Sequence, residues 1–477
     1  MTDRRKEDIK NVSLVVLFLT TILFLYLLWT ADARSSFNLL DIIGLRSGDA
    51  EVPAAEEILT PKSVILSDGS GVYHAAVGNS YKISQAASDY VTEACERTTV
   101  GITEINEMQF TAVMARYDSV QIALCCDVPF ADFVKHHSIR IGTAADSIND
   151  VSLIAFSEAS RDSIFICDAP AGRFFRLRFN EDHEYTASLI AMCEKSSDSY
   201  YFASDILGYG KAFIPVDVES SLTEKAYVTD AAAGGRELRN SMAEAVMGEN
   251  FDFVRRISDG FGNIIYMYGY GQKTFSASAD GSFEYSAEVS SGNAGDFYSD
   301  LNAAVTFIAR CGGWPEGSPS LVLDKAEQIS SARRSGHKYY FVQMIDGVPV
   351  RGEGRYSVEV EIINGQVSYF RRCTLQGQTG QSSGRSRTAE AVNVIASNCN
   401  HIYNVLNNNT LVAAADEAFS FVSAEISDIR QGYFNSTLGE RLVPCWIVRT
   451  RDGSEFFFDL YDASPLGFSR QEQDGLE

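Results

Sequence analysis

YSVEVEIINGQVSYFRR, residues 356–372, decides the fold class of this chain. Before the turn, apolar and polar residues alternate with a period of two, as in a strand with one buried face. The two sets are Val358, Val360 and Ile362 on one face and Ser357, Glu359 and Glu361 on the other. Asn364 and Gly365 follow, and these residue types adopt the positive φ of a tight hairpin turn. The stretch therefore predicts an antiparallel hairpin with one apolar face.

The sequence around this hairpin predicts a helix-plus-sheet unit over residues 319–470. Further strands are expected at residues 320–330, 337–350, 441–450 and 454–462, the last two joined by a turn at Asp452-Gly453. Between them, Thr388 is expected to cap a helix. Its apolar face is Val392, Ile395, Cys399, Ile402 and Leu406, spaced 3, 4, 3 and 4.

Two more units of the same α+β kind precede it. Residues 223–318 predict a helix at 236–247, then strands at 251–258, 263–271, 274–279 and 283–289, then a helix at 296–310. This middle unit and the last one read as helix plus curved antiparallel sheet, which suggests a weak duplication. Residues 58–222 predict an N-terminal α+β unit. Its helices are expected at 81–97, 131–137 and 188–195, a hairpin at 63–76, and further strands at 121–129, 151–157, 163–168 and 173–179.

The N-terminus carries an uncharged apolar run, VSLVVLFLTTILFLYLLW, at residues 12–29. At ~1.5 Å rise per residue a helix of this length spans roughly 27 Å, close to the hydrocarbon thickness of a bilayer. Basic residues gather on its N-terminal side, which predicts a cytoplasmic N-terminus and extracytoplasmic C-terminal domains. We therefore expect a cytoplasmic tail at 1–11, a transmembrane signal anchor at 12–30 and a stalk at 31–57. A cleaved signal peptide is the alternative, but its apolar core would be shorter.

Composition narrows the partners of the extracytoplasmic part. With 40 Lys+Arg against 63 Asp+Glu, the net charge is −23, so nucleic acid is excluded as a partner, and so is docking of the ectodomain onto anionic lipid. We expect the chain to contact the lipid bilayer through residues 12–30. Nine scattered cysteines show no zinc spacing, and several stand in apolar runs where a free thiol behaves as a small buried hydrophobe. The sequence leaves open whether some of these cysteines form one or two disulfide bonds.

No motif in the chain predicts chemistry. Gly380 to Gly384 fits G-x-S-x-G around Ser382, but it lies in a polar loop instead of a strand-turn-helix elbow. His136 and His137 are adjacent, so on a helix they point about 100° apart, which suits metal chelation poorly and favours a surface position. We expect no catalytic, cofactor-binding or metal-binding residue, and no cofactor. The chain reads as a binding or regulatory protein.

The order of elements resembles the YycH/YycI proteins of Firmicutes. The resemblance rests on the basic N-terminus, the anchor, QIALCCDVPF at 121–130, YYFVQMIDGVPV at 339–350, VEVEIINGQVSYF at 358–370 and LVPCWIVRTRDGSEFFFDLYD at 442–462. Length and the extra N-terminal unit are more similar to YycH. The resemblance implies an accessory protein that regulates the sensor histidine kinase of a cell-wall two-component system, together with a paralogous accessory membrane protein. Ser13, Thr20 and Thr21 are then the candidate transmembrane contacts, because the span has no GxxxG.

A second class of function stays open. The last unit also resembles PepSY-like modules, which implies an envelope protein that binds a peptide or inhibits a protease. Exposed sheet edges would then accept the peptide as an added strand. A neighbouring histidine kinase gene favours the first class, and a neighbouring peptidase gene favours the second.

Overall fold

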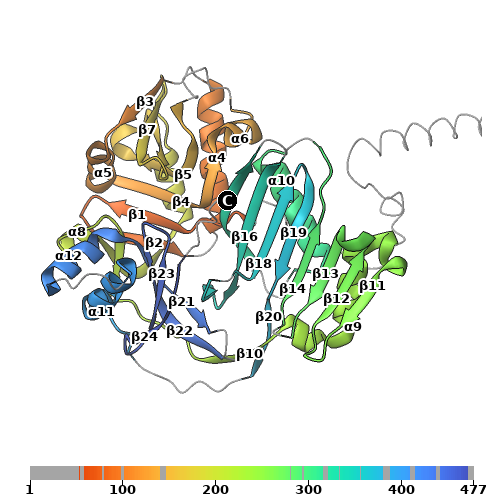
Figure 1. Cartoon of the computed structure of the whole chain (residues 1–477). Coiled ribbons are helices and arrows are strands. Elements are labelled where there is room, and N and C mark those ends of the chain that lie inside the picture. The colour runs from red at the N-terminus through yellow and green to blue at the C-terminus, as the bar shows by residue number, and fades with distance from the viewer. Residues whose placement is uncertain are drawn as a thin grey trace, which may run out of the picture. The chain divides into compact units, whose positions relative to one another are not determined.

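The computed structural model describes residue 53 and residues 58–470, except for gaps at 78–79, 98–100, 140–146, 280, 293–294, 315–320, 332–333, 355, 380–386, 409–413 and 437–440. Val52–Glu477 form one compact unit. It is an α+β structure of two large sheets with helices packed against them, which confirms the predicted class (Figure 1). No helix in the described ranges is long and apolar enough to cross a membrane, and the predicted anchor at 12–30 lies outside those ranges.

The N-terminal sheet is antiparallel throughout. Its strand order is β3 (Gly101–Ile105), β7 (Arg173–Arg178), β6 (Ser163–Asp168), β5 (Asp150–Ser157), β4 (Asp118–Pro129), β1 (Ser63–Asp68), β2 (Tyr73–Val77), β8 (Glu194–Phe202) and β9 (Phe213–Val216). Its helices are α4 (Ser80–Arg97), α5 (Glu107–Arg116), α6 (Phe130–His136), α7 (Tyr185–Met192), η2 (Glu158–Ser160) and α8 (Ala203–Ile206).

Both faces of this sheet are covered. Ile164 and Ile166 of β6 join the core that α4 contributes to, whereas Phe165 between them packs with Phe110 and Met114 of α5. The period of two along a strand thus places α4 and α5 on opposite faces. The helix that directly follows β4 is α6, and it lies at the end of that strand.

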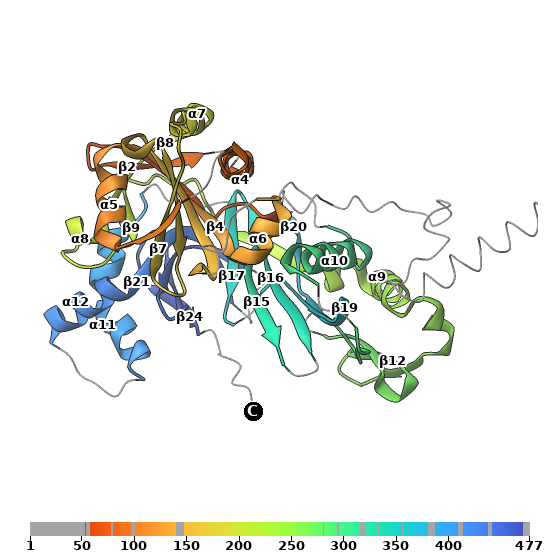
Figure 2. The ribbon, with the colours of Figure 1, turned by 90° about the horizontal axis from the view of Figure 1, so that it is seen from above.

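The second sheet contains three successive helix-then-meander segments. In the first, α9 (Asp230–Met247) and the turn η3 (Gly248–Phe253) precede β11 (Arg255–Ser258), β12 (Ile264–Tyr268), β13 (Lys273–Ala277) and β14 (Phe283–Ala287), with the turn η4 (Gly269–Gly271) before β13. In the second, α10 (Phe297–Arg310) precedes β15 (Leu321–Ser330), β16 (Ser335–Ile345), β17 (Val348–Gly352), β18 (Val358–Ile363) and β19 (Gln366–Arg372). The two meanders join where β14 pairs with β19. Figure 2 shows α9 and α10 on the same side of the joined sheet.

The third segment packs in a second core. Here α11 (Ala391–Leu406) and α12 (Ala415–Glu425) precede β21 (Ile426–Asn435), β22 (Arg441–Thr450), β23 (Glu455–Asp459) and β24 (Pro465–Ser469). It joins the second segment through the parallel pairing of β17 with β21. The strands β10 (Lys225–Thr229) and β20 (Leu375–Thr379) close the far end of the sheet. One core is shared by the N-terminal sheet and the first two segments, and a second core joins the third segment to α8 and β9 of the N-terminal part.

The hairpin that opened the sequence analysis is confirmed. Strands β18 and β19 pair around Asn364 and Gly365, whose φ values are 51° and 74°. Val358, Val360 and Ile362 are buried against α10, as their alternation predicts. The turn residues therefore have the positive φ that a two-residue hairpin requires.

Several local predictions are wrong at element boundaries. The strand expected over 337–350 is two strands, β16 and β17, and the strand expected over 263–271 ends at Tyr268, before the turn η4. Residues 251–253 belong to the short helix η3, so the strand expected from 251 begins only at Arg255. The helix expected over 188–195 is α7, which ends at Met192, because the chain then enters β8. Thr388 does not cap α11, whose N-cap residue is Glu390; the Thr388 hydroxyl instead donates to the carbonyl of Val218. A tertiary hydrogen bond has replaced the local cap.

Candidate functional site

A hollow lies where α4, β4, α6 and α10 meet. It encloses about 70 Å³ and is partly open to solvent. The residues that line it are Leu59, Ser84, Gln85, Ser88, Leu124, Cys125, Val128, Phe133, His136, His137 and Tyr298. The lining is mostly apolar with a few polar groups, which is the composition of small-molecule sites.

Aromatic rings form one wall of this hollow. The ring of His136 stacks on Tyr298 with centroids 3.7 Å apart and an interplanar angle of 9°. His137 packs edge to face on His136 and also contacts Phe133. Burial lowers the pKa of His137 to about 4, and the neighbouring His136 adds to the shift. His137 is therefore neutral at pH 7 and presents an uncharged ring to the hollow.

Helices α6 and α10 are joined beside the hollow by two polar contacts. The backbone N–H of Phe297 donates to the carboxylate of Asp132 over 2.8 Å. Lys135 forms an ion pair with Asp296, the N-cap residue of α10, and this hydrogen bond lowers the pKa of Asp296 to about 2. The contacts hold Tyr298, which follows directly, against His136.

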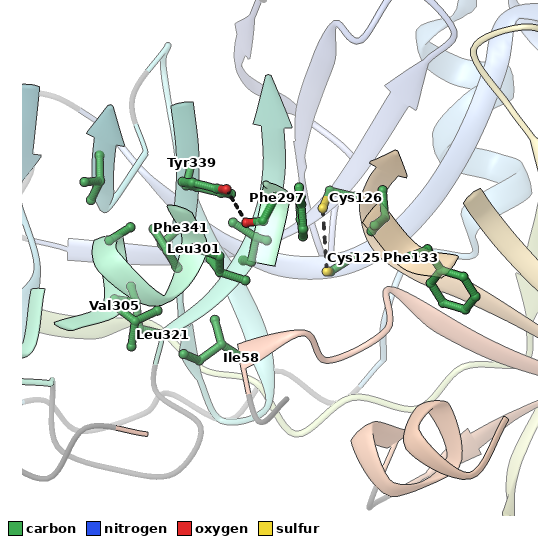
Figure 3. Packing of buried hydrophobic residues seen from close by; sticks show 14 of the residues in the cluster. Ile58, Cys125, Cys126, Phe133, Phe297, Leu301, Val305, Leu321, Tyr339 and Phe341 are labelled. Carbon is green, nitrogen blue, oxygen red and sulfur yellow. Dashed lines mark hydrogen bonds between the residues drawn. The ribbon is translucent and has the colours of Figure 1, made fainter. Parts of the chain in front are cut away.

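The hollow also contacts the segment that leads to the predicted stalk. Leu59 lines it, and the adjacent Ile58 is buried in the shared core, where Figure 3 shows it near Leu301 and Leu321. The predicted stalk, residues 31–57, ends directly before Ile58. A molecule in the hollow would thus touch the first part of the chain after that stalk.

A second polar cluster is buried within the sheet of the C-terminal half. Asp324 on β15 forms ion pairs with three arginines: Arg351 on β17, Arg430 on β21 and Arg449 on β22. Glu455 on β23 pairs with Arg351 and Arg449. Burial alone would raise the pKa of Asp324, but the three guanidinium groups hold it well below its ordinary range. The cluster joins five strands, and Asp324 stays ionised at neutral pH.

One His–Asp pair is buried on α10 and β16. Nδ1 of His337 lies 2.8 Å from the Asp300 carboxylate, and both residues are almost fully buried. Nε2 of His337 has no hydrogen-bond partner among the described residues. Acyl-transfer chemistry needs a nucleophile that is hydrogen-bonded to this nitrogen. Among the described residues, no nucleophile forms such a bond with Nε2 of His337.

The residues that the sequence singled out fall into two groups. Ser13, Thr20, Thr21 and Ser382 lie outside the described residues. Of the histidine pair, His136 is exposed as predicted, and His137 is half-buried beside it. Within the described ranges no group of three or more His, Cys, Asp and Glu side chains could hold a metal ion.

Sequence reasoning missed the hollow and the buried ionic cluster. Both assemble residues that are far apart in the chain, such as Leu59 with Tyr298, or Asp324 with Arg449. A signal did exist for the cluster, since charged Asp324 and Arg351 interrupt otherwise apolar strand runs. Near the hollow, aromatic residues follow Pro129 at the end of a long strand. This local pattern does not indicate that their partner lies on α10.

Comparison with known proteins adds one structure. No family model matches the chain, and no curated protein does. The chain is similar to an uncharacterized protein from Eubacterium rectale ATCC 33656 of known crystal structure, with 11% sequence identity and a TM-score of 0.34. The match covers 57% of this chain and 94% of that one.

Proposed function

We propose that this chain is a membrane-anchored extracytoplasmic accessory protein that regulates a sensor histidine kinase of a cell-wall two-component system and is not itself an enzyme. The observation that carries the proposal is the position of the hollow, which is lined by Leu59, next to the predicted stalk. A ligand bound there contacts the segment that leads to the predicted span at 12–30. Ligand occupancy then biases the orientation of the span, and the kinase responds to the span.

The resemblance to YycH/YycI supports the kinase as the partner, and a paralogous accessory membrane protein as its companion. The hollow supports a ligand with a flat or branched apolar group, because apolar side chains form most of its lining and the His136–Tyr298 stack offers a ring face. Ser84, Ser88 and Gln85 supply hydroxyl and amide groups that orient such a ligand.

The contact with the kinase is proposed to run through Ser13, Thr20 and Thr21. Hydroxyl groups that hydrogen-bond between membrane helices contribute about 0.6 kcal/mol each on average, so losing one changes a two-state output roughly threefold. Replacing Thr20 and Thr21 by Leu is therefore expected to change the output of the kinase reporter by that order or more. Replacing Val15 and Val16 by Leu is the matched control, because it keeps every hydroxyl. Equal output from both variants would refute a contact at these threonines.

The ligand step has its own test. Ser84→Phe places a ring into the hollow from α4, and Lys82→Phe places the same ring on the exposed side of that helix. We expect Ser84→Phe to fix the kinase output at one level while Lys82→Phe responds like the wild type. A normal response in Ser84→Phe would show that the hollow is not the sensing site.

The second candidate function is peptide binding by a PepSY-like envelope module, and one observation favours it. Strand β11 lies at the end of the sheet order, pairs only with β12 among the described strands, and has all its residues exposed. Phe253 and Phe261 flank it and are 78% and 86% exposed. An extended peptide could add to this edge. Ile257→Lys, which places a charge on the edge, should then abolish peptide capture without changing kinase output.

A further inference from the structure

Two adjacent thiols contact each other on β4. The Cys125 Sγ lies 3.9 Å from the Cys126 Sγ, the contact drawn as a dashed line in Figure 3. Adjacent residues of a regular strand point to opposite faces, which keeps their side chains apart. Strand β4 departs from that geometry because its register against β5 shifts between Ala123 and Val128. The irregularity brings the two sulfur atoms together.

The pair also adjoins the hollow. Both cysteines pack into the shared core, and Cys125 is also one of the residues that line the hollow. Both side chains are buried, at 2% and 4% exposure, and all nine cysteines of the chain are free thiols. The hollow is therefore the route by which a small reagent reaches the pair, and Cys125 is the sulfur it meets.

We propose that Cys125 and Cys126 form a dithiol site that is reversibly oxidised to a disulfide by low-molecular-weight disulfides entering the hollow. In the first step the Cys125 thiolate attacks one sulfur of the small disulfide, which yields a mixed disulfide and releases one small thiol. In the second step the Cys126 thiolate attacks the Cys125 sulfur and expels the other small thiol. Two cysteine thiols are oxidised, one disulfide is reduced, and the two cysteine protons end on the released thiols.

The order of the two steps follows from the surroundings of each sulfur. The contact with the Cys125 sulfur, together with burial, raises the pKa of Cys126, so Cys126 is a poor first nucleophile. After the mixed disulfide forms, Cys126 lies beside its target and the reaction is intramolecular, which compensates for its small thiolate fraction.

The product is expected to be easily reduced. Consecutive Cα atoms are about 3.8 Å apart, below the range of about 4.4–6.8 Å that most disulfides span. Disulfides outside the preferred geometry have more oxidising potentials and behave as labile or regulatory bonds. Closing the sulfur gap to about 2.05 Å also moves the Cys125 sulfur and changes the wall of the hollow. The inference does not depend on the kinase as partner.

The test uses the purified full-length chain in mild detergent, treated with glutathione disulfide and digested with trypsin. Cleavage after Arg116 and Lys135 releases one peptide, residues 117–135, in which Cys125 and Cys126 are the only cysteines. We expect this peptide to be lighter than the dithiol form by two hydrogen atoms, and to return to the dithiol with dithiothreitol. The peptide that contains buried Cys311 should stay unmodified in the same sample, because burial raises the pKa of that thiol to about 12.

Two variants make the result decisive. Cys126→Ser removes the second nucleophile, so its mixed disulfide at position 125 should accumulate at least about tenfold above the wild-type level. Cys399→Ser, a buried cysteine in the other core, should behave like the wild type and controls for folding. The proposal is overturned if wild type and Cys126→Ser accumulate the same mixed disulfide, or if peptide 117–135 stays a dithiol.

Discussion

Asp324 holds together charges from several strands, and its side chain is only 4% exposed. Removing its charge would leave Arg351, which is equally buried, facing two other guanidinium groups with Glu455 as the remaining buried acid. Breaking a buried ion pair by removing one partner costs roughly 3–5 kcal/mol. We therefore expect Asp324→Asn to lower the free energy of unfolding in urea by about that amount.

Glu284 provides the control for this substitution. Glu284 forms an ion pair with Arg371, and the Glu284 side chain is 46% exposed. Exposed ion pairs contribute about 0–1 kcal/mol to stability. Glu284→Gln should therefore leave the unfolding midpoint nearly unchanged. Equal losses from Asp324→Asn and Glu284→Gln would contradict a structural role for the buried cluster.

His137 makes stability depend on pH. Its pKa is about 4 in the folded chain against 6.5 in the unfolded one, so the unfolded state binds more protons between these values. Its stabilising effect is full above pH 6.5 and is lost as the pH falls towards 4, with a loss on the order of 2 kcal/mol. His137→Gln should flatten the unfolding free energy over this range, whereas His136→Gln should reduce the pH dependence only in part, because burial is the larger cause of the shift. An unchanged pH profile in His137→Gln would disprove the assignment.

At the residue scale, sequence reasoning succeeds where the conformation of a residue's own backbone determines the residue type. Asn364 and Gly365 are of this kind, because a positive φ is a local requirement. It fails where a side chain bonds to a partner that is distant in the sequence. Thr388 has the right type for a helix cap, yet its hydroxyl bonds to Val218, which lies far away in the sequence.

Helix α10 links the two sheets, and its N-cap residue, Asp296, has two roles. The side chain of Asp296 accepts from the Ser299 N–H as an N-cap and also pairs with Lys135 of α6. Losing an N-cap costs about 0.5–2 kcal/mol, whereas an exposed ion pair contributes little. Asp296→Ala should therefore destabilise the chain by about 1 kcal/mol, and Asp296→Ser should recover most of it. If Ser is as destabilising as Ala in urea unfolding, the ion pair matters more than the cap.

At the element scale, long periodic segments are predicted well and short irregular ones are not. The strands of β12, β13 and β14, and the helix α10, follow from alternation, glycine punctuation and a 3, 4, 3 spacing. The segment before β11 has apolar residues at strand-like spacing, but Phe253 is 78% exposed and belongs to a helical turn. Apolar spacing alone does not say whether a buried face exists to receive it.

At the scale of the whole molecule, one core crosses from the N-terminal sheet into the next two segments. Ile166 on β6 and Ile362 on β18 are both fully buried in it. Replacing either by Ala should cost about 2–5 kcal/mol and should shift one common unfolding transition, seen alike by circular dichroism and tryptophan fluorescence. Ile265→Ala, on an exposed strand face, is the control and should change little. Separate transitions for the two buried variants would contradict a shared core.

Sequence reasoning reached the α+β class because it depends on local patterns, and it suggested the repetition of helix and meander. It did not reach the joining of the parts, in which β14 pairs with β19 and β17 with β21. Such pairings depend on which strand edges remain open after each meander forms. The hollow arises at another such contact, where β4 and α6 of the N-terminal part meet α10, so local patterns could not locate it either.

The most direct test of the proposed function is in-cell crosslinking and recovery of the full-length chain. It is compared with a version whose residues 12–29 are replaced by an unrelated membrane span. We predict that the native span recovers a sensor histidine kinase and that the replaced span does not. Recovery of an envelope peptidase or a peptide by both versions, without the kinase, would contradict regulation through the membrane and would support peptide binding by the extracytoplasmic part.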